Sequence, residues 1–287
     1  MSGPKLRARR SCLAVPGSSP KMLAKAQGLP ADQVFLDLED AVAPLAKPDA
    51  RKNIVAALNE GDWGGKTRVV RVNDLTTSWT YRDTIEVVEG AGELLDCIML
   101  PKVQTADQIV WLDLLLTQIE KTMGFEVGRI GIEAQIENAR GLVNVDAIAA
   151  ASPRLETVIF GPADFMASIN MKSLVVGEQP PGYDVGDAYH YILMRILMAA
   201  RTNNLQAIDG PYCRSRTSTA TAAWPAAPRR WATTANGSCT PARSTPPTRC
   251  SRRRRRTTTT PSSSWTPTTT TARRKAACGA RSCSATR

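Results

Sequence analysis

The chain lacks the features that would place it in a membrane or among zinc proteins. No apolar run reaches the roughly 20 residues that span a bilayer, and the apolar stretch after the basic N-terminus is too short for a signal peptide. None of the seven cysteines has the paired spacing of a zinc site. The single histidine, His190, lies in a helical pattern and is expected to be a packed core or interface residue rather than a base. We therefore expect a cytoplasmic protein that uses neither a membrane nor zinc.

Residues 213–287 lack most of what a folded domain needs. They contain no Val, Ile, Leu, Met, Phe or Tyr and no Asp or Glu, but 15 Arg and one Lys. The formal net charge of +11 belongs to this tail, because residues 1–212 hold 21 basic and 26 acidic residues, a net of −5. A segment so poor in apolar residues cannot offset its ordering entropy. The composition thus predicts a folded domain over residues 1–212 and a disordered, basic, low-complexity tail over residues 213–287.

The tail has two alternative interpretations. Taken as written, the run Arg252 to Arg256 could contact polyanions, but there is no motif for specific nucleic-acid recognition. The other interpretation is a shifted reading frame. With GC-rich codons read one nucleotide earlier, residues 232–242 regroup to Gly-Tyr-Asp-Gly-Lys-Trp-Val-Leu-His-Pro-Gly, and residues 251–260 and 261–271 also regroup to foldable sequence. A single missing nucleotide near the codons of Tyr212 and Cys213 would explain all three windows.

Short β-rich apolar runs alternate with helical patterns before the tail. Strands are predicted at 11–15, 33–38, 67–72, 97–100, within 129–137, within 157–164 and at 205–209, and helices at 21–27, 47–58, 79–89, 106–122 and 189–203. This alternation is typical of a parallel α/β sheet. It predicts a (β/α)8 barrel (a TIM barrel) whose last β/α unit is lost to the frameshifted, disordered tail.

Carboxylates follow two consecutive strands. Glu137 ends the fifth predicted strand, and Asp164 comes directly after the sixth. The carboxyl ends of neighbouring parallel strands meet at one face of a barrel, where active sites lie. Two carboxylates with no Cys or His nearby suit Mg²⁺, which takes one or two carboxylates plus water and substrate oxygens. The alternative is structural: Glu137 caps a helix start and Asp164 is a helix N-cap before Phe165.

Charged residues follow three other strands. Arg71 offers a planar fork that suits a carboxylate such as that of glyoxylate, or else it forms a salt bridge to Asp37 or Glu39. Asp37, Glu39 and Asp40 are expected to orient Arg71 or metal-bound waters, or to form a helix N-terminus. We expect Lys102, after the fourth strand, to be a solvated loop charge rather than a cation at the edge of the site.

Several motifs together match one known group of enzymes. They are Val15-Pro16-Gly17, Leu36-Asp-Leu-Glu-Asp-Ala-Val42, Val70-Arg-Val-Asn73, Met99-Leu-Pro-Lys-Val103, Ile136-Glu-Asn-Ala-Arg-Gly-Leu142 and Gly161-Pro-Ala-Asp164. On these motifs, residues 11–212 resemble the citrate lyase β-subunit-like group of the HpcH/HpaI aldolase superfamily, particularly the malyl-CoA/β-methylmalyl-CoA lyases.

The resemblance implies a TIM-barrel enzyme, a homo-oligomer (trimer or hexamer), that cleaves or forms a carbon–carbon bond beside a CoA thioester with Mg²⁺. Glu137 and Asp164 match the metal ligands, and Glu137 also contacts substrate. Arg71 matches the catalytic arginine that holds the substrate carboxylate. Lys25 matches a basic residue that contacts the CoA phosphates. The implied partners are an acyl-CoA and a glyoxylate-type substrate.

The chain departs from the malyl-CoA lyase pattern in two ways. Ala14 stands where a Phe is usual and Ser19 where an Arg is usual, both at CoA-contacting positions. The family's catalytic acidic residue comes from a C-terminal lid of a neighbouring subunit, and residues 213–287 as written contain no acidic residue to supply it. The alternatives are therefore a malyl-CoA thioesterase-type hydrolase, an inactive truncated barrel with a polyanion-binding tail, or a CoA-independent pyruvate aldolase of the wider superfamily, which the motifs disfavour.

Overall fold

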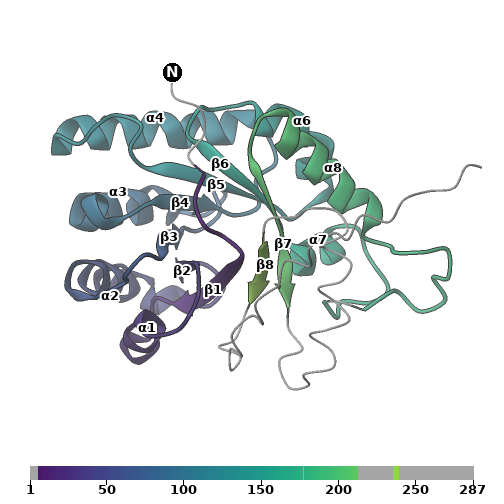
Figure 1. Cartoon of the computed structure of the whole chain (residues 1–287), viewed down its shortest axis with the longest axis horizontal. Helices are drawn as coiled ribbons and strands as arrows, with labels where there is room; N and C mark the ends of the chain where they lie inside the picture. Colours follow the sequence, from purple (N-terminus) through teal and green to yellow (C-terminus); the bar gives the residue numbers. More distant parts are fainter. Residues whose placement is uncertain (1–5, 177, 213–234, 239–287) are drawn as a thin grey trace, which may run out of the picture. The chain divides into compact units, whose positions relative to one another are not determined.

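The computed structural model describes residues 6–176 and 178–212, together with the backbone strand at residues 235–238 (Figure 1). The strands are β1 Ser11–Pro16, β2 Gln33–Asp37, β3 Thr67–Arg71, β4 Cys97–Leu100, β5 Gly131–Ile136, β6 Leu155–Phe160, β7 Gln206–Tyr212 and β8 Ala235–Ser238. The helices are α1 Pro20–Gln27, α2 Lys47–Glu60, α3 Thr80–Ala91, α4 Ala106–Met123, α5 Ala139–Val143, α6 Val145–Ala149, α7 Pro162–Ser168 and α8 His190–Thr202, with 3-10 turns at Pro44–Ala46 and Gly92–Leu94.

The strands form one curled parallel sheet in chain order. Each strand from β1 to β7 pairs in parallel with the next along the chain. Every residue of β4, β5 and β6 is buried, as expected for parallel strands covered on both faces. The alternating pattern therefore predicted the α/β class, and most of the predicted bounds lie within two residues of the observed ones.

The eighth position of the sheet differs from the sequence-based prediction. That prediction left the position empty, yet β8 pairs in parallel with both β7 and β1, so the ring of strands closes through it. Ladder hydrogen bonds are made by the backbone, so a short segment without proline can fill the gap whatever its side chains. The predicted disorder of the rest of the tail, and any helix after β8, lie outside the described residues.

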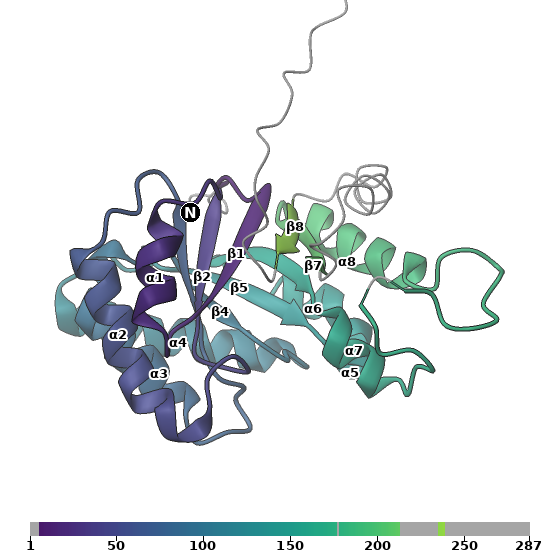
Figure 2. The ribbon, with the colours of Figure 1, turned by 90° about the horizontal axis from the view of Figure 1, so that it is seen from below.

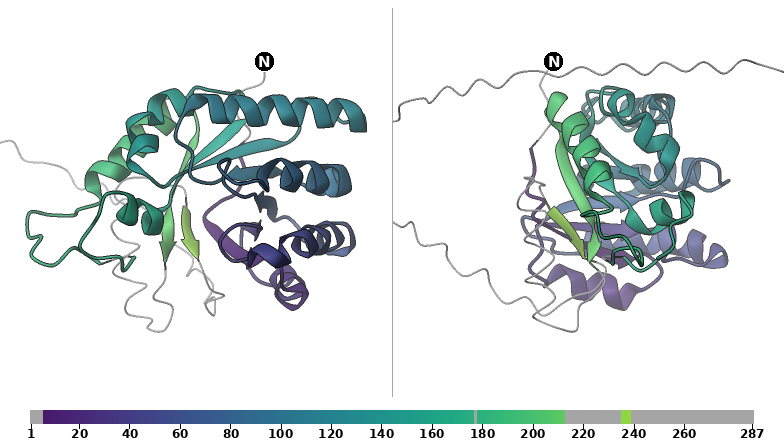
Figure 3. Two further views of the ribbon diagram at one scale, coloured as in Figure 1. Left: turned by 180° about the vertical axis from the view of Figure 1, so that it is seen from behind. Right: turned by 90° about the vertical axis from the view of Figure 1, so that its right-hand side faces the viewer.

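The helices cover the outer face of the sheet. Figures 2 and 3 show α1 to α4 side by side over the first strands, while α8 covers β6 and β7 and α6 packs against α4 and α8. Helix α4 starts at a capping box formed by Thr105 and Gln108, and it ends at Gly124 in the left-handed region (φ 73°), so local signals fix both ends. The main hydrophobic core lies between these helices and the sheet.

The interior of the ring has a charged floor at the amino ends of the strands. Arg9 is fully buried there and makes ion pairs with Glu133 (2.8 Å) and Glu156 (2.6 Å), and it donates a hydrogen bond to Gln33 (2.8 Å). Above it lies a small apolar layer that includes Met99, Ile159 and Ile208. The floor closes one end of the ring, so the open end is the one at which the strands terminate.

The fold also tests the expectations about membrane spans and about His190. No helix of the described residues is both long and apolar enough to cross a membrane. His190 is exposed at the start of α8, so the prediction that it packs in the core is wrong. Its neighbour Tyr189 is the residue that turns inward, 3% exposed and beside Phe160. An interface role for His190 stays a prediction.

Candidate active site

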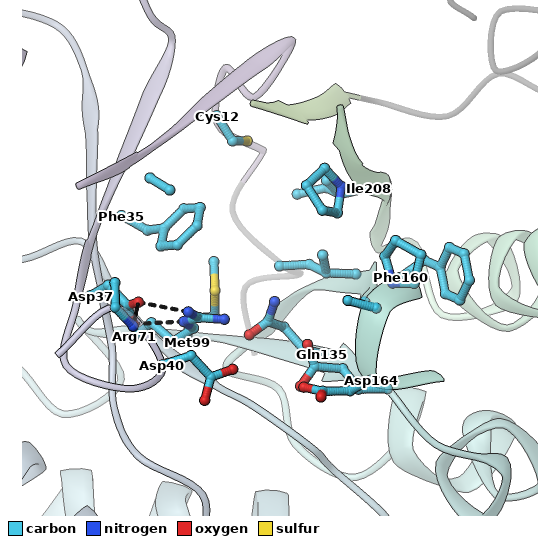
Figure 4. A pocket seen from close by; sticks show the side chains of 18 of the residues that line it. Cys12, Phe35, Asp37, Asp40, Arg71, Met99, Gln135, Phe160, Asp164 and Ile208 are labelled. Carbon is cyan, nitrogen blue, oxygen red and sulfur yellow. Dashed lines mark hydrogen bonds and ion pairs between the residues drawn. The ribbon is translucent and has the colours of Figure 1, made fainter. Parts of the chain in front are cut away.

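A cavity of about 420 Å³ opens where the strands end. Figure 4 shows Arg71 and Asp37 on one of its sides and Asp164 and Gln135 on the other. Of the residues predicted from sequence, Arg71, Asp37, Asp40, Glu137 and Asp164 all line this cavity. The fold thus brings together charged side chains that lie up to 127 positions apart in the sequence.

Arg71, the last residue of β3, is held in a fixed orientation by Asp37 at the end of β2. Its Nε and Nη2 donate to the two carboxylate oxygens of Asp37 at 2.7 and 2.6 Å, and its guanidinium lies over the ring of Phe35. Asp37 also accepts the backbone N–H groups of Glu39 and Ala41. Burial alone would raise the pKa of Asp37, but Arg71 and these N–H groups hold it below its ordinary value.

The salt-bridge alternative for Arg71 is thus observed, but it does not use the whole guanidinium. Nη1 forms an ion pair with Glu39 at 3.2 Å and makes no hydrogen bond to any residue in the described part of the chain. Because Arg71 also lines the cavity, Nη1 can still donate to a bound carboxylate. The helix N-terminus alternative for Asp37, Glu39 and Asp40 does not hold, since α2 begins only at Lys47.

Lys102 is not the solvated loop charge that was predicted. It is a cation of the site, with Nζ 2.9 Å from Glu39, 3.6 Å from Asp40 and 3.4 Å from Asp164. Its backbone N–H donates to Glu137 at 3.0 Å, with φ at 53°. Left-handed backbone at a non-glycine residue is costly and persists where surrounding contacts require it. Residues from four loops create this environment, so local sequence could not reveal it.

Glu137 follows β5 and is almost completely buried, with 5% of its surface exposed. Burial raises its pKa to about 8, the carboxylates of Glu39 and Asp164 add to the rise, and Arg71 opposes it. A Cβ atom at Gly161 would overlap the Glu137 carboxylate, so only glycine leaves room for it there. The helix-cap alternative for Glu137 is wrong, because Asn138 is the N-cap of α5 and accepts from Gly141 N–H.

Asp164 lies on the other side of Gly161, in the first turn of α7. The N-cap of that helix is Gly161, so Asp164 is not the N-cap that the structural alternative required. Its side chain is 42% exposed and faces the cavity beside Lys102. The two predicted metal ligands therefore differ in environment: Glu137 is buried, and Asp164 is open to solvent and ligand.

The donor set fits Mg²⁺. The described residues contain no cluster of three or more His, Cys, Asp or Glu side chains suited to a metal. Two carboxylates beside a cavity with room for water and substrate match what Mg²⁺ requires. The raised pKa of Glu137 also shows a buried carboxyl group whose ionised form lacks enough positive charge nearby. Glu137 and Asp164 would hold the ion.

Lys25 is a predicted site residue that, like Glu39, does not line the cavity. It is exposed on α1, one helical turn after Met22, which does line the cavity. Residues three apart lie on the same side of a helix, so Lys25 lies on the same side of α1 as Met22. Ala14 lines the cavity, and Ser19 is the N-cap of α1. Contact with CoA phosphates stays a prediction.

Of the buried polar residues that line the cavity, Gln33, Gln135 and Asp209 were not predicted from sequence. Gln135 (7% exposed) and Asp209 (3% exposed) each have a buried side-chain oxygen without a hydrogen-bond partner among the described residues. Asp209 is the last residue of the predicted seventh strand and lies within the observed β7, so the pattern of charged residues at predicted strand ends could have indicated it. Gln135 faces the cavity two positions before Glu137, as the period of a strand requires.

Comparison with known proteins decides the family. The family model of the HpcH/HpaI aldolase/citrate lyase group matches residues 10–238, a range that includes β8. The chain belongs to this family. The resemblance inferred from the motifs is therefore confirmed.

Individual relatives support the same assignment. The chain is 41% identical to the L-malyl-CoA/β-methylmalyl-CoA lyase of Cereibacter sphaeroides, over 73% of this chain and 68% of the relative. It is 34% identical to the citrate lyase subunit β of Escherichia coli, over 72% and 65%. The solved structure of CitE from Mycobacterium tuberculosis with magnesium and acetate matches at 27% identity and a TM-score of 0.65, over 82% and 87%. The prediction of a carbon–carbon lyase of the CoA-ester lyase type is thus confirmed.

Proposed function

We propose that the protein is a Mg²⁺-dependent lyase that cleaves or forms a carbon–carbon bond in a 3-hydroxyacyl-CoA such as malyl-CoA, giving glyoxylate and acetyl-CoA or propionyl-CoA. The observation that carries this proposal is the convergence of Arg71, Glu137 and Asp164 on one cavity at the carboxyl ends of the strands. The names of the relatives supply the substrate class. A cytoplasmic homo-oligomer stays a prediction.

Each residue would have a separate role in such a reaction, and that role follows from its position in the cavity. Glu137 and Asp164 would hold the Mg²⁺ ion, which supplies Lewis-acid stabilisation of the negative charge that develops on the substrate oxygens. Arg71, fixed by Asp37, offers Nη1 to the substrate carboxylate. Lys102 links the carboxylates of Glu39 and Asp164 and keeps the loops after β2, β4 and β6 together.

The complete enzyme is proposed to be a (β/α)8 barrel whose final unit is encoded in the shifted frame. Residues 1–212 would form the part of the lyase that is in frame, and residues 213–287 the part that is not. The position of β8 supports this proposal, because Ala235–Ser238 falls inside the window that regroups to a loop, a strand and a turn. The predicted lid residue would also come from the regrouped tail.

The test is a product assay with two proteins, the chain as written and its frame-restored version. Each is incubated with malyl-CoA and Mg²⁺, and glyoxylate, acetyl-CoA, malate and free CoA are measured. The proposal predicts glyoxylate and acetyl-CoA from the restored enzyme, no products from its Glu137→Gln variant, and little turnover by the chain as written. Malate and free CoA as the products would establish the thioesterase alternative. No turnover by the restored enzyme would refute the proposal.

A further inference from the structure

One residue contacts both proposed metal ligands. The backbone N–H of Lys102 donates to Glu137 Oε2 at 3.0 Å, and its Nζ lies 3.4 Å from Asp164 Oδ2. Lys102 belongs to the loop after β4, whereas Glu137 and Asp164 follow β5 and β6. The left-handed φ of 53° at Lys102 is costly for a residue with a side chain, so the surrounding structure holds this double contact in place.

The Lys102 ammonium and a bound metal ion would need the same carboxylate. Lys102 is the only cation among the described residues that forms an ion pair with Asp164. A Mg²⁺ ion that binds to Asp164 therefore meets a positive charge that is already against that carboxylate, and the two cations repel each other. The side chains of Lys102 and Asp164 are 27% and 42% exposed, so solvent weakens this repulsion but does not remove it.

The charges around the proposed ligands are unbalanced in a way that gives Lys102 weight. Five carboxylates lie against two cations, a net charge of −3 when all of them are ionised; the anions are Asp37, Glu39, Asp40, Glu137 and Asp164, and the cations are Arg71 and Lys102. Arg71 is occupied by the carboxylates of the β2 loop. Loss of the Lys102 charge would change the net charge to −4 and strengthen the attraction for a divalent cation.

Lys102 carries its charge throughout the neutral pH range. Burial alone would lower its pKa, but Glu39, Asp40 and Asp164 raise the pKa above its ordinary value. The other lysine beside these loops, Lys47, donates to the carbonyls of Leu38 and Glu39 and to the side chain of Asn73. Those contacts position the backbone after β2, so Lys47 does not take part in the competition for Asp164.

We propose that Lys102 is a tethered cation that competes with Mg²⁺ for Asp164 and thereby limits the Mg²⁺ affinity of the site. The inference rests on the metal site of the proposed function, but not on the reaction. A site weakened in this way exchanges its ion with the solution, so its occupancy follows the concentration of free Mg²⁺.

Calorimetric titration of the full chain with MgCl₂ tests the competition directly. Lys102→Met keeps most of the side-chain length and removes the charge, so it should bind Mg²⁺ about tenfold more tightly than the parent. Lys102→Arg keeps the charge, and its affinity should stay close to that of the parent. Lys121→Met removes an exposed lysine of α4 outside the cavity and should leave the affinity unchanged.

Thermal unfolding supplies a second measurement on the same proteins. In EDTA, Lys102→Met should unfold at a lower temperature than the parent, because the buried carboxylate of Glu39 loses a cation. Saturating Mg²⁺ should then raise the unfolding midpoint of Lys102→Met by about 3–5 °C more than it raises that of the parent, as tenfold tighter binding requires.

The competing explanation predicts the opposite sign. If Lys102 only holds the loops together, its removal should loosen the site and weaken Mg²⁺ binding. Equal or weaker binding by Lys102→Met and by Lys102→Gln would overturn the inference and leave the proposed function standing; two variants are used so that a folding defect in one does not decide the result. Mg²⁺ binding by neither the parent nor any variant would refute the metal site of the proposed function, and the inference with it.

Discussion

Replacing Glu137 with glutamine should change stability and metal binding in opposite directions. The pKa of this buried carboxyl is about 8, against an ordinary 4.5. Because the folded-state pKa is raised, the unfolded chain ionises first as the pH rises, and the fold loses stability between about pH 4.5 and pH 8. At pH 7 the loss is about 3 kcal/mol. Glutamine cannot ionise, so the metal-free Glu137→Gln variant should be more stable by about this amount at pH 7 and equal to the parent near pH 4.

Mg²⁺ binding should respond in the other direction. The variant keeps an oxygen that can accept the Lys102 N–H but has lost one of two anionic ligands, so its Mg²⁺ affinity should fall at least about tenfold. The parent protein should also release close to one proton per Mg²⁺ bound at pH 7, since Glu137 is mostly protonated before the ion binds. The variant should release none.

Urea unfolding in EDTA at pH 4 and pH 7 measures the change in the free energy of unfolding. Calorimetric titration with MgCl₂ in buffers of different ionisation enthalpy measures the Mg²⁺ affinity and the number of protons released. Glu126→Gln, an exposed carboxylate outside the cavity, is the control and should change neither quantity. A Glu137→Gln variant that is less stable than the parent at pH 7 without metal, or that binds Mg²⁺ as tightly as the parent, would refute this reasoning.

Three other substitutions test separate parts of the structure. Arg71→Lys removes the planar guanidinium, so the affinity for glyoxylate, measured by calorimetry with Mg²⁺ present, should fall by about tenfold or more. Unchanged affinity would mean that Arg71 only forms a salt bridge. Gly161→Ala places a Cβ atom against the carboxylate of Glu137, the proposed metal ligand, and should abolish Mg²⁺ binding, whereas Gly65→Ala, with open space around it, should not. Arg9→Ala leaves the buried carboxylate of Glu133 without its cation and Glu156 with Arg7 alone, so it should lower the unfolding free energy in urea by about 3–5 kcal/mol. Arg10→Ala, at an exposed ion pair with Asp32, is the control and should leave the unfolding free energy nearly unchanged.

The sequence determined the fold class and the charged residues at the strand ends. Apolar runs with strand and helix periods are local signals, so β4 was predicted at its observed bounds, Cys97–Leu100, and α4 within one residue. The carboxyl ends of parallel strands share one face of the sheet. This rule alone predicted that Arg71, Glu137 and Asp164 lie at one cavity. The family followed from the motifs around those same residues.

Only the tertiary structure decided how these side chains pair. Lys102 is a site cation because carboxylates from the loops after β2 and β6 approach it, and no local pattern encodes that approach. Asp209 Oδ2 has no hydrogen-bond partner among the described residues, and this follows from the position of β7 beside β6 in the sheet. Periodicity fixes which face of an element is buried, whereas ion pairs between distant loops depend on register and distance, and those exist only once the chain has folded.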